Sequence, residues 1–305
     1  MHKIAFNEVY LSGKEKKYIA DALNSGNLSG DGLYTRKVSD FLKEKFALKQ
    51  VLMTTSATHA LEMAAQLINL KENDEVIMPS FTFSSTANAV LKEGARPVFA
   101  EIKPDTFNLD PLDFEAKITD KTKAVIPVHY AGISCEMDQI REIAAKNNIS
   151  IIEDAAHAVN SFYRGEAAGS LGDFGCYSFH GSKNFISGEG GALIINSEQK
   201  EVIKKAEIIR EKGTNRSRFL RGEIDKYSWV GEGSSYLPSD ILMALLFAQL
   251  EEMDYITAQR KKVFDYYNYH LKEFLSKDFL EVIPRVPSDR KSNYHIYYLK
   301  FKNQK

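Results

Sequence analysis

The chain has 305 residues, 44% of them hydrophobic and 27% charged, a composition typical of soluble globular proteins. Its 40 basic and 41 acidic residues give a net charge of −1, so the whole-chain balance does not favour a nucleic acid as partner. The two cysteines, Cys135 and Cys176, lack C-x-x-C spacing. This argues against a disulfide framework or a cysteine-ligated zinc site and favours a reducing compartment.

The N-terminal segment "MHKIAFNEVYLSGKEKKYIADAL" lacks the apolar centre of a signal peptide. The longest apolar run toward the C-terminus, "ILMALLFA" at 241–248, is much shorter than the ~20 residues needed to span a bilayer. We therefore expect a cytoplasmic protein with no membrane insertion.

Strand-like and helix-like segments alternate from Gln50 onward. β-Branched and apolar runs predict strands at 50–56, 75–80, 95–102, 123–130 and 149–154. Apolar residues at helical spacing predict helices at 57–70, 86–94 and 137–148. Such alternation indicates an α/β fold, with a mostly parallel central sheet that helices cover on both faces.

After Asn196 the pattern predicts a helix at 197–211, an irregular polar stretch at 212–237 and one long helix from Ser239 to about Lys272.

The last residues, 293–305, alternate like a strand and then stop. A lone terminal strand cannot complete a domain. We therefore expect a large domain at 1–238, with an N-terminal arm, followed at 239–305 by a linking helix and the start of a truncated small α+β domain.

Ligands of an open parallel sheet bind beyond the carboxyl ends of its strands. The stretch "TSATHA" at 55–60 turns a strand directly into a helix. Ser56, Ala57 and Thr58 would present backbone N–H groups and a hydroxyl at the positive helix end, which suits a phosphate. Simple capping of the helix by Ser56 or Thr58 explains the same residues.

Asp154 ends the apolar run "IIED", so its carboxyl group needs a partner or a raised pKa. The protonated ring nitrogen of a cofactor would be one partner, and backbone amides would be another. His157 fits a cofactor contact or an ordinary core or surface histidine. Phe81, in "PSFTF", is placed either to stack on a planar ligand or to join the core.

Lys183 lies between the strand-like "YSFH" at 177–180 and the glycine-rich "SGEGGALII" at 187–195. Held there away from water, its amine would have a lowered pKa and react as a nucleophile, and the glycines let backbone approach a bulky ligand. A lysine by itself is usually a solvated charge. A phosphate seat, an acid facing a ring nitrogen, a stacking aromatic and such a lysine together indicate a pyridoxal phosphate site.

Blocks along essentially the whole chain resemble the DegT-type sugar-nucleotide aminotransferases. They are "SATHALEMA", "PSFTFSSTANAV", "IPVHYAG", "EDAAHAV", "GDFGCYSFHGSKNFISGEGGALI" and "AQLEEMD". The resemblance implies the aspartate-aminotransferase-like fold of type I, pyridoxal 5'-phosphate bound by the large domain, and homodimers with sites at the subunit interface. It also implies that Lys183 forms the Schiff base with the cofactor and that Asp154 pairs with the pyridine nitrogen.

The resemblance implies further cofactor contacts at Ala57, Thr58, Phe81, His157 and Ser178. The family's G-x-N-x-R block departs here, because it reads Gly233-Ser234-Ser235-Tyr236-Leu237. Ser235 thus stands where an asparagine usually reaches the cofactor phosphate of the neighbouring subunit. With the arginine missing, the nucleotide phosphates would be held by Lys212, Arg216 or Lys226, unless these form a solvated loop face. Other implied substrate contacts are Thr35, His129 and Tyr227.

Within the family, residues 210–241, "REKGTNRSRFLRGEIDKYSWVGEGSSYLPSDI", are similar to members that make dTDP-4-amino-4,6-dideoxygalactose for surface polysaccharides such as enterobacterial common antigen. "LSGDGLYTRK" at 28–37 agrees with this. The similarity implies that L-glutamate donates the amino group and dTDP-4-keto-6-deoxy-D-glucose accepts it.

Two alternatives remain open: amination of another keto-sugar nucleotide, such as a 3-keto or UDP sugar, and a non-catalytic cofactor-binding protein. A nicotinamide enzyme is disfavoured because "GEGGAL" lacks the third glycine of G-x-G-x-x-G. A G-x-S-x-G elbow, an H-E-x-x-H motif and a P-loop are also missing from the sequence, and no metal is expected.

Overall fold

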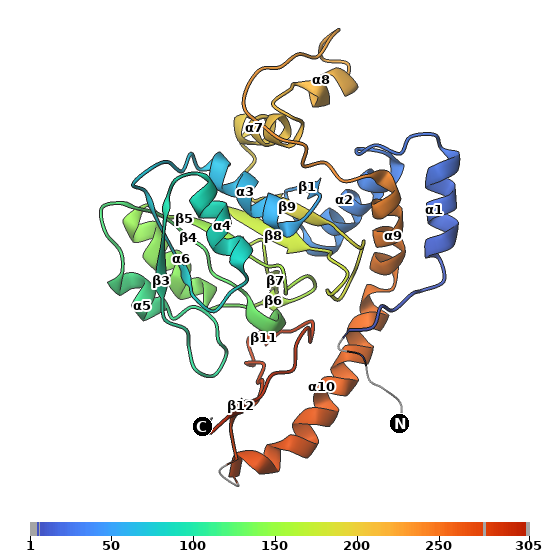
Figure 1. The fold of residues 1–305 in the computed structure, drawn as a ribbon. Helices are drawn as coiled ribbons and strands as arrows, with labels where there is room; N and C mark the ends of the chain where they lie inside the picture. The colour runs from blue at the N-terminus through green and yellow to red at the C-terminus, as the bar shows by residue number, and fades with distance from the viewer. Residues whose placement is uncertain (1–4, 6, 277–278, 303–305) are drawn as a thin grey trace.

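The computed structural model describes residues 5, 7–276 and 279–302 (Figure 1). Its main sheet has seven strands in the order β1-β9-β8-β5-β4-β2-β3. Their bounds are β1 Gln50–Thr54, β2 Glu75–Pro79, β3 Arg96–Ala100, β4 Thr122–Val125, β5 Ser150–Asp154, β8 Phe174–Ser178 and β9 Gly191–Ile195. Neighbouring strands from β8 to β3 pair in parallel, and β9 is antiparallel to both of its neighbours. The predicted, mostly parallel sheet is confirmed.

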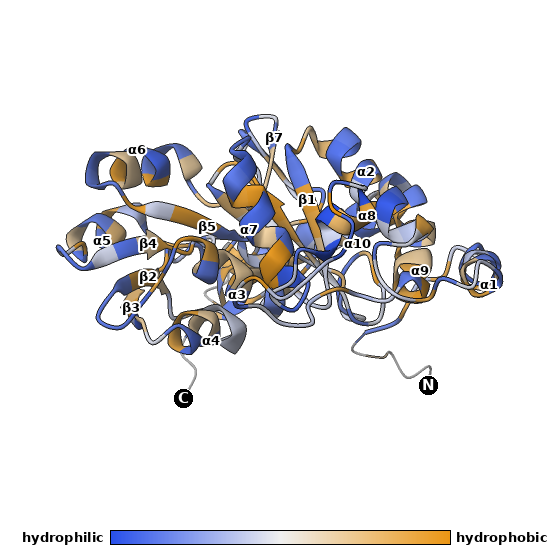
Figure 2. Cartoon of the chain, turned by 90° about the horizontal axis from the view of Figure 1, so that it is seen from above, coloured by the Kyte–Doolittle hydropathy of each residue, from blue (hydrophilic) through white to orange (hydrophobic). Residues whose placement is uncertain are grey.

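Helices cover both faces of this sheet. Seen from above, α5 (Pro111–Ala116) and α6 (Met137–Asn147) lie on one side, and α3 (Ala57–Leu67) and α4 (Ser84–Lys92) lie on the other (Figure 2). Adjacent residues of β2 show the division, because Ile77 packs with α5 and α6 whereas Val76 and Met78 pack with α3 and α4. Since successive side chains of a strand point to opposite faces, a strand buried on both faces must be apolar throughout.

The other helices lie around the β1 and β9 end of the sheet. They are α1 Glu15–Asn24, α2 Leu33–Phe46, α7 Lys200–Arg210, α8 Arg216–Leu220, α9 Asp240–Glu251 and α10 Met253–Ser276, with the 3-10 turn η1 at Tyr130–Gly132. α2 and α9 pack on the sheet, whereas α10 runs away from α9 along one side of the molecule (Figure 1). Of the helices in the described part of the chain, none combines the length and the apolar character that crossing a bilayer requires.

Two small sheets of short strands accompany the main sheet. They are β6 Phe162–Tyr163, β7 Glu166–Ala167 and β11 Arg290–Lys291, which form one sheet, and β10 Leu280–Val282 with β12 Lys300–Phe301, which form another. Because β11 pairs with β6, the residues after Lys291 continue from a strand pair next to residues 162–163.

Two expected elements are wrong. The long helix predicted from Ser239 is divided into α9 and α10 at Glu252, whose φ of −101° and ψ of 13° leave the helical range. Helical periodicity continues on both sides, so the bend leaves no mark in the pattern. The strand predicted at 293–305 is limited to β12 within the described residues, because Tyr294 has a φ of 57° that an extended strand does not accommodate. Residues 303–305 lie outside the described range.

Candidate active site

The N-terminus of α3 lies at the carboxyl end of β1. The hydroxyl of Ser56 accepts the N–H of His59 at 3.1 Å and so caps the helix. Within the described chain, no group accepts a hydrogen bond from the N–H of Ala57 or Thr58, which leaves two donors at the positive helix end. A Cβ on Gly191 would lie 2.3 Å from the carbonyl carbon of Ser56, so only glycine lets β9 pass this close to the turn. The turn therefore caps α3 and still offers donors to an anion.

Asp154 is the last residue of β5 and is only 5% exposed. One carboxylate oxygen accepts the hydroxyl of Thr86 at 2.7 Å, and the other accepts the N–H of Ala156 at 3.2 Å. Among the residues that the structure describes, no lysine, arginine or histidine forms an ion pair with Asp154. A buried carboxylate held only by neutral donors is suited to a cationic ligand group.

Lys183 lies in the loop between β8 and β9. The N–H of Phe179 donates to the carbonyl of Gly190 at 2.8 Å, and the N–H of Gly181 donates to that of Gly188 at 2.7 Å, so the base of the loop is closed. Burial lowers the pKa of the Lys183 amine, and the Asp154 carboxylate opposes the shift without cancelling it. A lysine with a lowered pKa has more neutral amine near pH 7, which is the nucleophilic form.

His157 lies close to Lys183. Burial, reinforced by the positive charge of Lys183, lowers the pKa of His157 to about 3. Its imidazole is therefore neutral near pH 7. His157, Ser178 and Lys183 line one small cavity, to which Asn293 and His295 also contribute.

The C-terminal segment that contains Asn293 and His295 makes hydrogen bonds to two parts of the site. The amide of Asn184, next to Lys183, donates to the carbonyl of Asn293 at 2.8 Å and accepts from Nδ1 of His295 at 2.8 Å. The side-chain amide of Asn293 donates in turn to the carbonyl of His157 at 2.8 Å. The His295 ring centroid lies 4.6 Å from that of His157. Residues 293–295 thus connect the lysine loop to the histidine.

Phe81 is 43% exposed and belongs to an aromatic cluster. Its ring centroid lies 4.8 Å from that of Tyr130 and 5.2 Å from that of Phe107, and Tyr130 lies 5.7 Å from His157. The cluster extends to the small cavity beside Lys183, so Phe81 is near the site and partly open to a ligand.

Two expected substrate contacts lie in the interior. The hydroxyl and N–H of Thr35 donate to Asp240 at 2.8 and 2.7 Å. Nδ1 of His129 accepts the N–H of Cys135 at 3.0 Å, so Nε2 carries the proton and donates to Glu153 at 2.8 Å. Both side chains are buried and make their bonds within the protein, so neither presents a free group beside Lys183.

The other expected contacts lie in the 212–235 loop region, and the described chain does not bring them to Lys183. Arg216 pairs with Glu211 at 3.0 Å, and Lys212 lies 3.9 Å from the same residue. Lys226, Tyr227 and Ser235 are exposed. In the described chain none of these residues lines a cavity that Lys183 lines.

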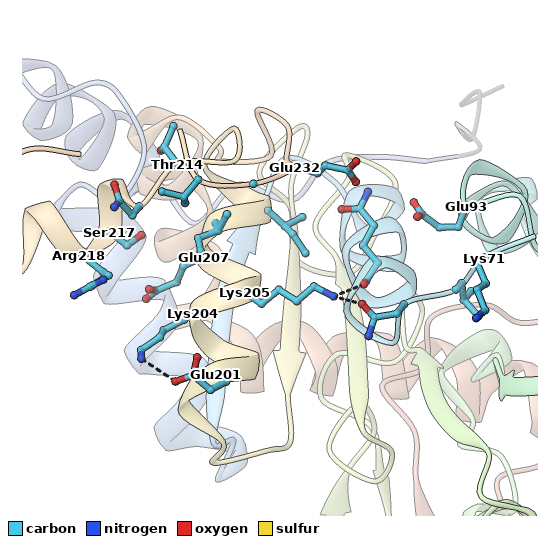
Figure 3. A pocket seen from close by; sticks show the side chains of 18 residues that line it. Lys71, Glu93, Glu201, Lys204, Lys205, Glu207, Thr214, Ser217, Arg218 and Glu232 are labelled. Atoms are coloured by element: carbon cyan, nitrogen blue, oxygen red, sulfur yellow. Dashed lines mark hydrogen bonds and ion pairs between the residues drawn. The ribbon is translucent and has the colours of Figure 1, made fainter. Parts of the chain in front are cut away.

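Figure 3 shows a cavity of about 800 Å³ between α3, α7 and α8. Lys205 reaches across it to the carbonyl of Gln66 at 2.9 Å, and Lys204 pairs with Glu201 at 2.9 Å. No expected site residue of the described chain lines it. Besides the small cavity lined by His157 and Ser178, a second cavity adjoins Lys183, of about 350 Å³ and beside α10. The volume of a cavity therefore does not identify the active site in this protein.

Three residues that hold the site in place were not predicted from the sequence: Thr86, Asn184 and His295. Thr86 is 68 residues from Asp154 and His295 is 111 from Asn184, so no local pattern relates either pair. Glu153 did leave a signal. Strand alternation directs it away from Asp154, and its carboxylate accepts the N–H groups of Gly169, Leu171 and Gly172.

A family model described as the DegT/DnrJ/EryC1/StrS aminotransferase family matches residues 10–305. The chain belongs to this family. GDP-perosamine synthase of Caulobacter vibrioides is 35% identical over 261 residues, 86% of this chain and 68% of that protein. Spr1654 of Streptococcus pneumoniae, solved in its PLP form, is 27% identical with a TM-score of 0.87, over 97% of this chain and 77% of that one. Helicobacter pylori PseC, an aminotransferase of pseudoaminic acid biosynthesis, is 28% identical with a TM-score of 0.86, over 97% and 76%.

Membership of this family makes the chain an aminotransferase that acts on sugar nucleotides and depends on pyridoxal phosphate. The family, the fold type and the enzyme class expected from the sequence are confirmed. The residues present fit the cofactor: a lysine amine with a lowered pKa, a buried carboxylate without a cationic partner, and two free N–H groups in a turn that a Cβ on Gly191 would fill. Because GDP-perosamine synthase and PseC belong to the synthesis of different sugars, membership of the family does not fix the sugar.

Proposed function

We propose that the chain transfers the amino group of L-glutamate to dTDP-4-keto-6-deoxy-D-glucose and forms dTDP-4-amino-4,6-dideoxy-D-galactose. The observation that carries the proposal is the amine of Lys183, whose pKa burial lowers, beside Asp154 and His157. The sugar rests on the resemblance of residues 210–241 to the family members that make this product.

In this proposal Lys183 would hold the cofactor covalently through its amine, and Asp154 would keep the ring nitrogen protonated. The N–H groups of Ala57 and Thr58 and the hydroxyl of Ser178 hold the phosphate. Phe81 and His157 flank the ring. The bound cofactor supplies an electron sink for the carbanion that forms at the α-carbon of the donor.

The chain's own residues move the proton. The amine of Lys183, released from its covalent bond when the amino donor takes its place, would accept the α-proton of the donor, because burial lowers the pKa of this group and favours its neutral form. Asp154 cannot leave its place, since Thr86 and Ala156 hold both of its oxygens. His157 stays neutral and adds no positive charge near the amine.

We propose that the 212–235 loop region contributes to the active site of a second subunit. Ser235 is exposed, as are Lys226 and Tyr227, and none of them lines a cavity beside Lys183 in the described chain. We therefore propose a homodimer in which Ser235 reaches the partner's cofactor phosphate, and Lys212, Arg216 or Lys226 reach the nucleotide phosphates. Thr35 and His129 support the fold beside the site.

The assignment of Lys183 is tested by reduction with borohydride followed by peptide mass spectrometry. We expect the pyridoxyl mass on the peptide that contains Lys183. Lys183→Ala should lose this label, the visible absorbance and turnover, whereas Lys204→Ala, on the exposed side of α7, should keep all three. A label on another lysine, or normal turnover by Lys183→Ala, would refute the assignment.

A GDP-linked keto sugar is the second candidate, because GDP-perosamine synthases are among the similar proteins, at 35% identity in one case. Measuring kcat/KM with dTDP-, GDP- and UDP-linked 4-keto sugars and with a dTDP-linked 3-keto sugar separates the candidates. Preference for another acceptor by about tenfold or more would replace the dTDP substrate. Absence of any reaction with glutamate would favour a non-catalytic cofactor-binding protein.

A further inference from the structure

The cavity of about 350 Å³ beside Lys183 is bounded by the lysine loop, α10, the segment around Tyr10 and the C-terminal segment at 294–297, with Gln249 of α9. α10 contributes two polar side chains, Gln259 and Arg260, among apolar and aromatic ones, Tyr255, Ile256, Val263 and Phe264. Glu8 is the one carboxylate among the described lining residues, and it is exposed. A volume of this size suits a small ligand or part of a larger one.

Arg260 is the unusual residue of this cavity. Its Nη1 donates to the backbone carbonyl of His295 at 3.3 Å, and this is the one hydrogen bond that its guanidinium makes to the described residues. No carboxylate of the described chain pairs with it. Arg260 is half-buried, and this partial loss of water lowers its pKa.

An arginine stays charged in proteins, so this desolvation cannot be relieved by loss of a proton. A buried charge without a counter-charge is costly, and the cost is offset when an anion binds. The planar guanidinium presents paired N–H donors that match the two oxygens of a carboxylate or a phosphate. Arg260 retains most of its donors for such a ligand.

We propose that Arg260 binds an oxyanion of a substrate while that substrate reacts at Lys183, because both side chains line the same cavity. This inference rests on the proposed function. Both substrates reach the same amine in turn and both carry such a group, the amino donor a carboxylate and the sugar nucleotide a diphosphate. Arg260 is thereby a substrate-binding residue in addition to those of the lysine loop.

The test measures the two half-reactions separately in the cofactor-loaded protein, with L-glutamate in one arm and dTDP-4-keto-6-deoxy-D-glucose in the other. Arg260→Gln should raise the half-saturating concentration about tenfold or more in at least one arm. Its rate at saturation should change far less, because the residue binds rather than moves protons. The arm that responds identifies the anion, carboxylate or diphosphate.

Two further variants serve as controls. Arg260→Lys keeps the charge but loses the paired donors, so it should fall between the wild type and Arg260→Gln. Lys262→Gln removes an exposed charge from the same helix and should leave both arms unchanged. If Arg260→Gln stays within about twofold of the wild type in both arms, the inference is wrong.

A second measurement needs no variant and so remains decisive if Arg260→Gln does not fold. Phenylglyoxal modifies accessible arginines, and mass spectrometry measures each site. Glutarate or dTDP should slow the modification of Arg260 about fivefold or more and leave exposed Arg141 unaffected. Equal rates at Arg260 with and without both probes would overturn the inference. Failure of the proposed function has a different signature, since it would appear in the wild type as the loss of the pyridoxyl label at Lys183.

Discussion

Lys183, His157 and His295 are basic side chains whose pKa values fall because folding removes water from them. Burial is the largest cause for each, and the positive Lys183 lowers the pKa of both histidines further. At the scale of single residues, the site therefore favours neutral nitrogen bases. Arg260 is the exception, because a guanidinium does not give up its proton near neutrality.

A pH dependence of stability follows for His295. Its pKa in the folded chain lies well below 6.5, so the unfolded chain binds more protons below that value. Stability should therefore fall as the pH decreases from about 6.5, by up to about 1.4 kcal/mol per pH unit for each buried histidine.

Urea unfolding of the apo protein at several pH values checks this. His295→Gln keeps an N–H for Asn184 but does not titrate, so it should reduce the slope. His180→Gln is the control, because that imidazole is 51% exposed. An unchanged slope in His295→Gln would show that His295 does not contribute.

At the scale of elements, β9 and the first turn of α3 pack closely because Gly191 has no side chain. A Cβ there would lie 2.4 Å from the backbone nitrogen of Ala57, so a larger residue must separate strand and helix. The two free N–H groups of the turn would move with the helix.

Gly191→Ala should therefore weaken the binding of pyridoxal phosphate, with a rise in Kd of about tenfold, and should destabilise the fold by about 1–3 kcal/mol. Equilibrium titration with the cofactor and urea unfolding measure the two effects. Gly231→Ala is the matched control, because the nearest atom to its added Cβ is 3.7 Å away. Normal cofactor affinity in Gly191→Ala would contradict the role given to the turn.

At the scale of the whole molecule, residues distant in the chain hold the N-terminal helices in place. Asp240, the first residue of α9, accepts the N–H of Tyr34 at 3.1 Å and both the N–H and the hydroxyl of Thr35. Since the N-cap of α2 is Gly32, which has no side chain, Asp240 provides that helix with its cap. Through these two hydrogen bonds Thr35 helps to hold α2 against α9.

Asp240→Ala should destabilise the protein by about 2 kcal/mol, because buried donors of α2 lose their acceptor. Asp240→Asn, which keeps an oxygen, should cost less, and Asp40→Ala on the exposed side of α2 should cost little. Urea unfolding measures all three. Equal stability of Asp240→Ala and the wild type would show that other groups cap α2.

Much of the architecture is visible in local patterns. The strands β1 to β5 and the helices α3, α4 and α6 begin and end within a few residues of their predicted bounds, because the burial of a strand or a helix face imposes its own periodicity. The bend at Glu252 and the left-handed Tyr294 are invisible, since neither interrupts the alternation of apolar and polar residues.

The sequence by itself determined the family, the strands β1 to β5 with the helices α3, α4 and α6, and the loop that contains Lys183, because each depends on residues close together in the chain. Only the tertiary structure decided which distant groups surround that amine. Asn184 and His295 are 111 residues apart in the chain. The partial burial of Arg260 arises because α10 packs against the C-terminal segment that contains His295. Desolvation depends on what packs around a group, and no local pattern contains that information.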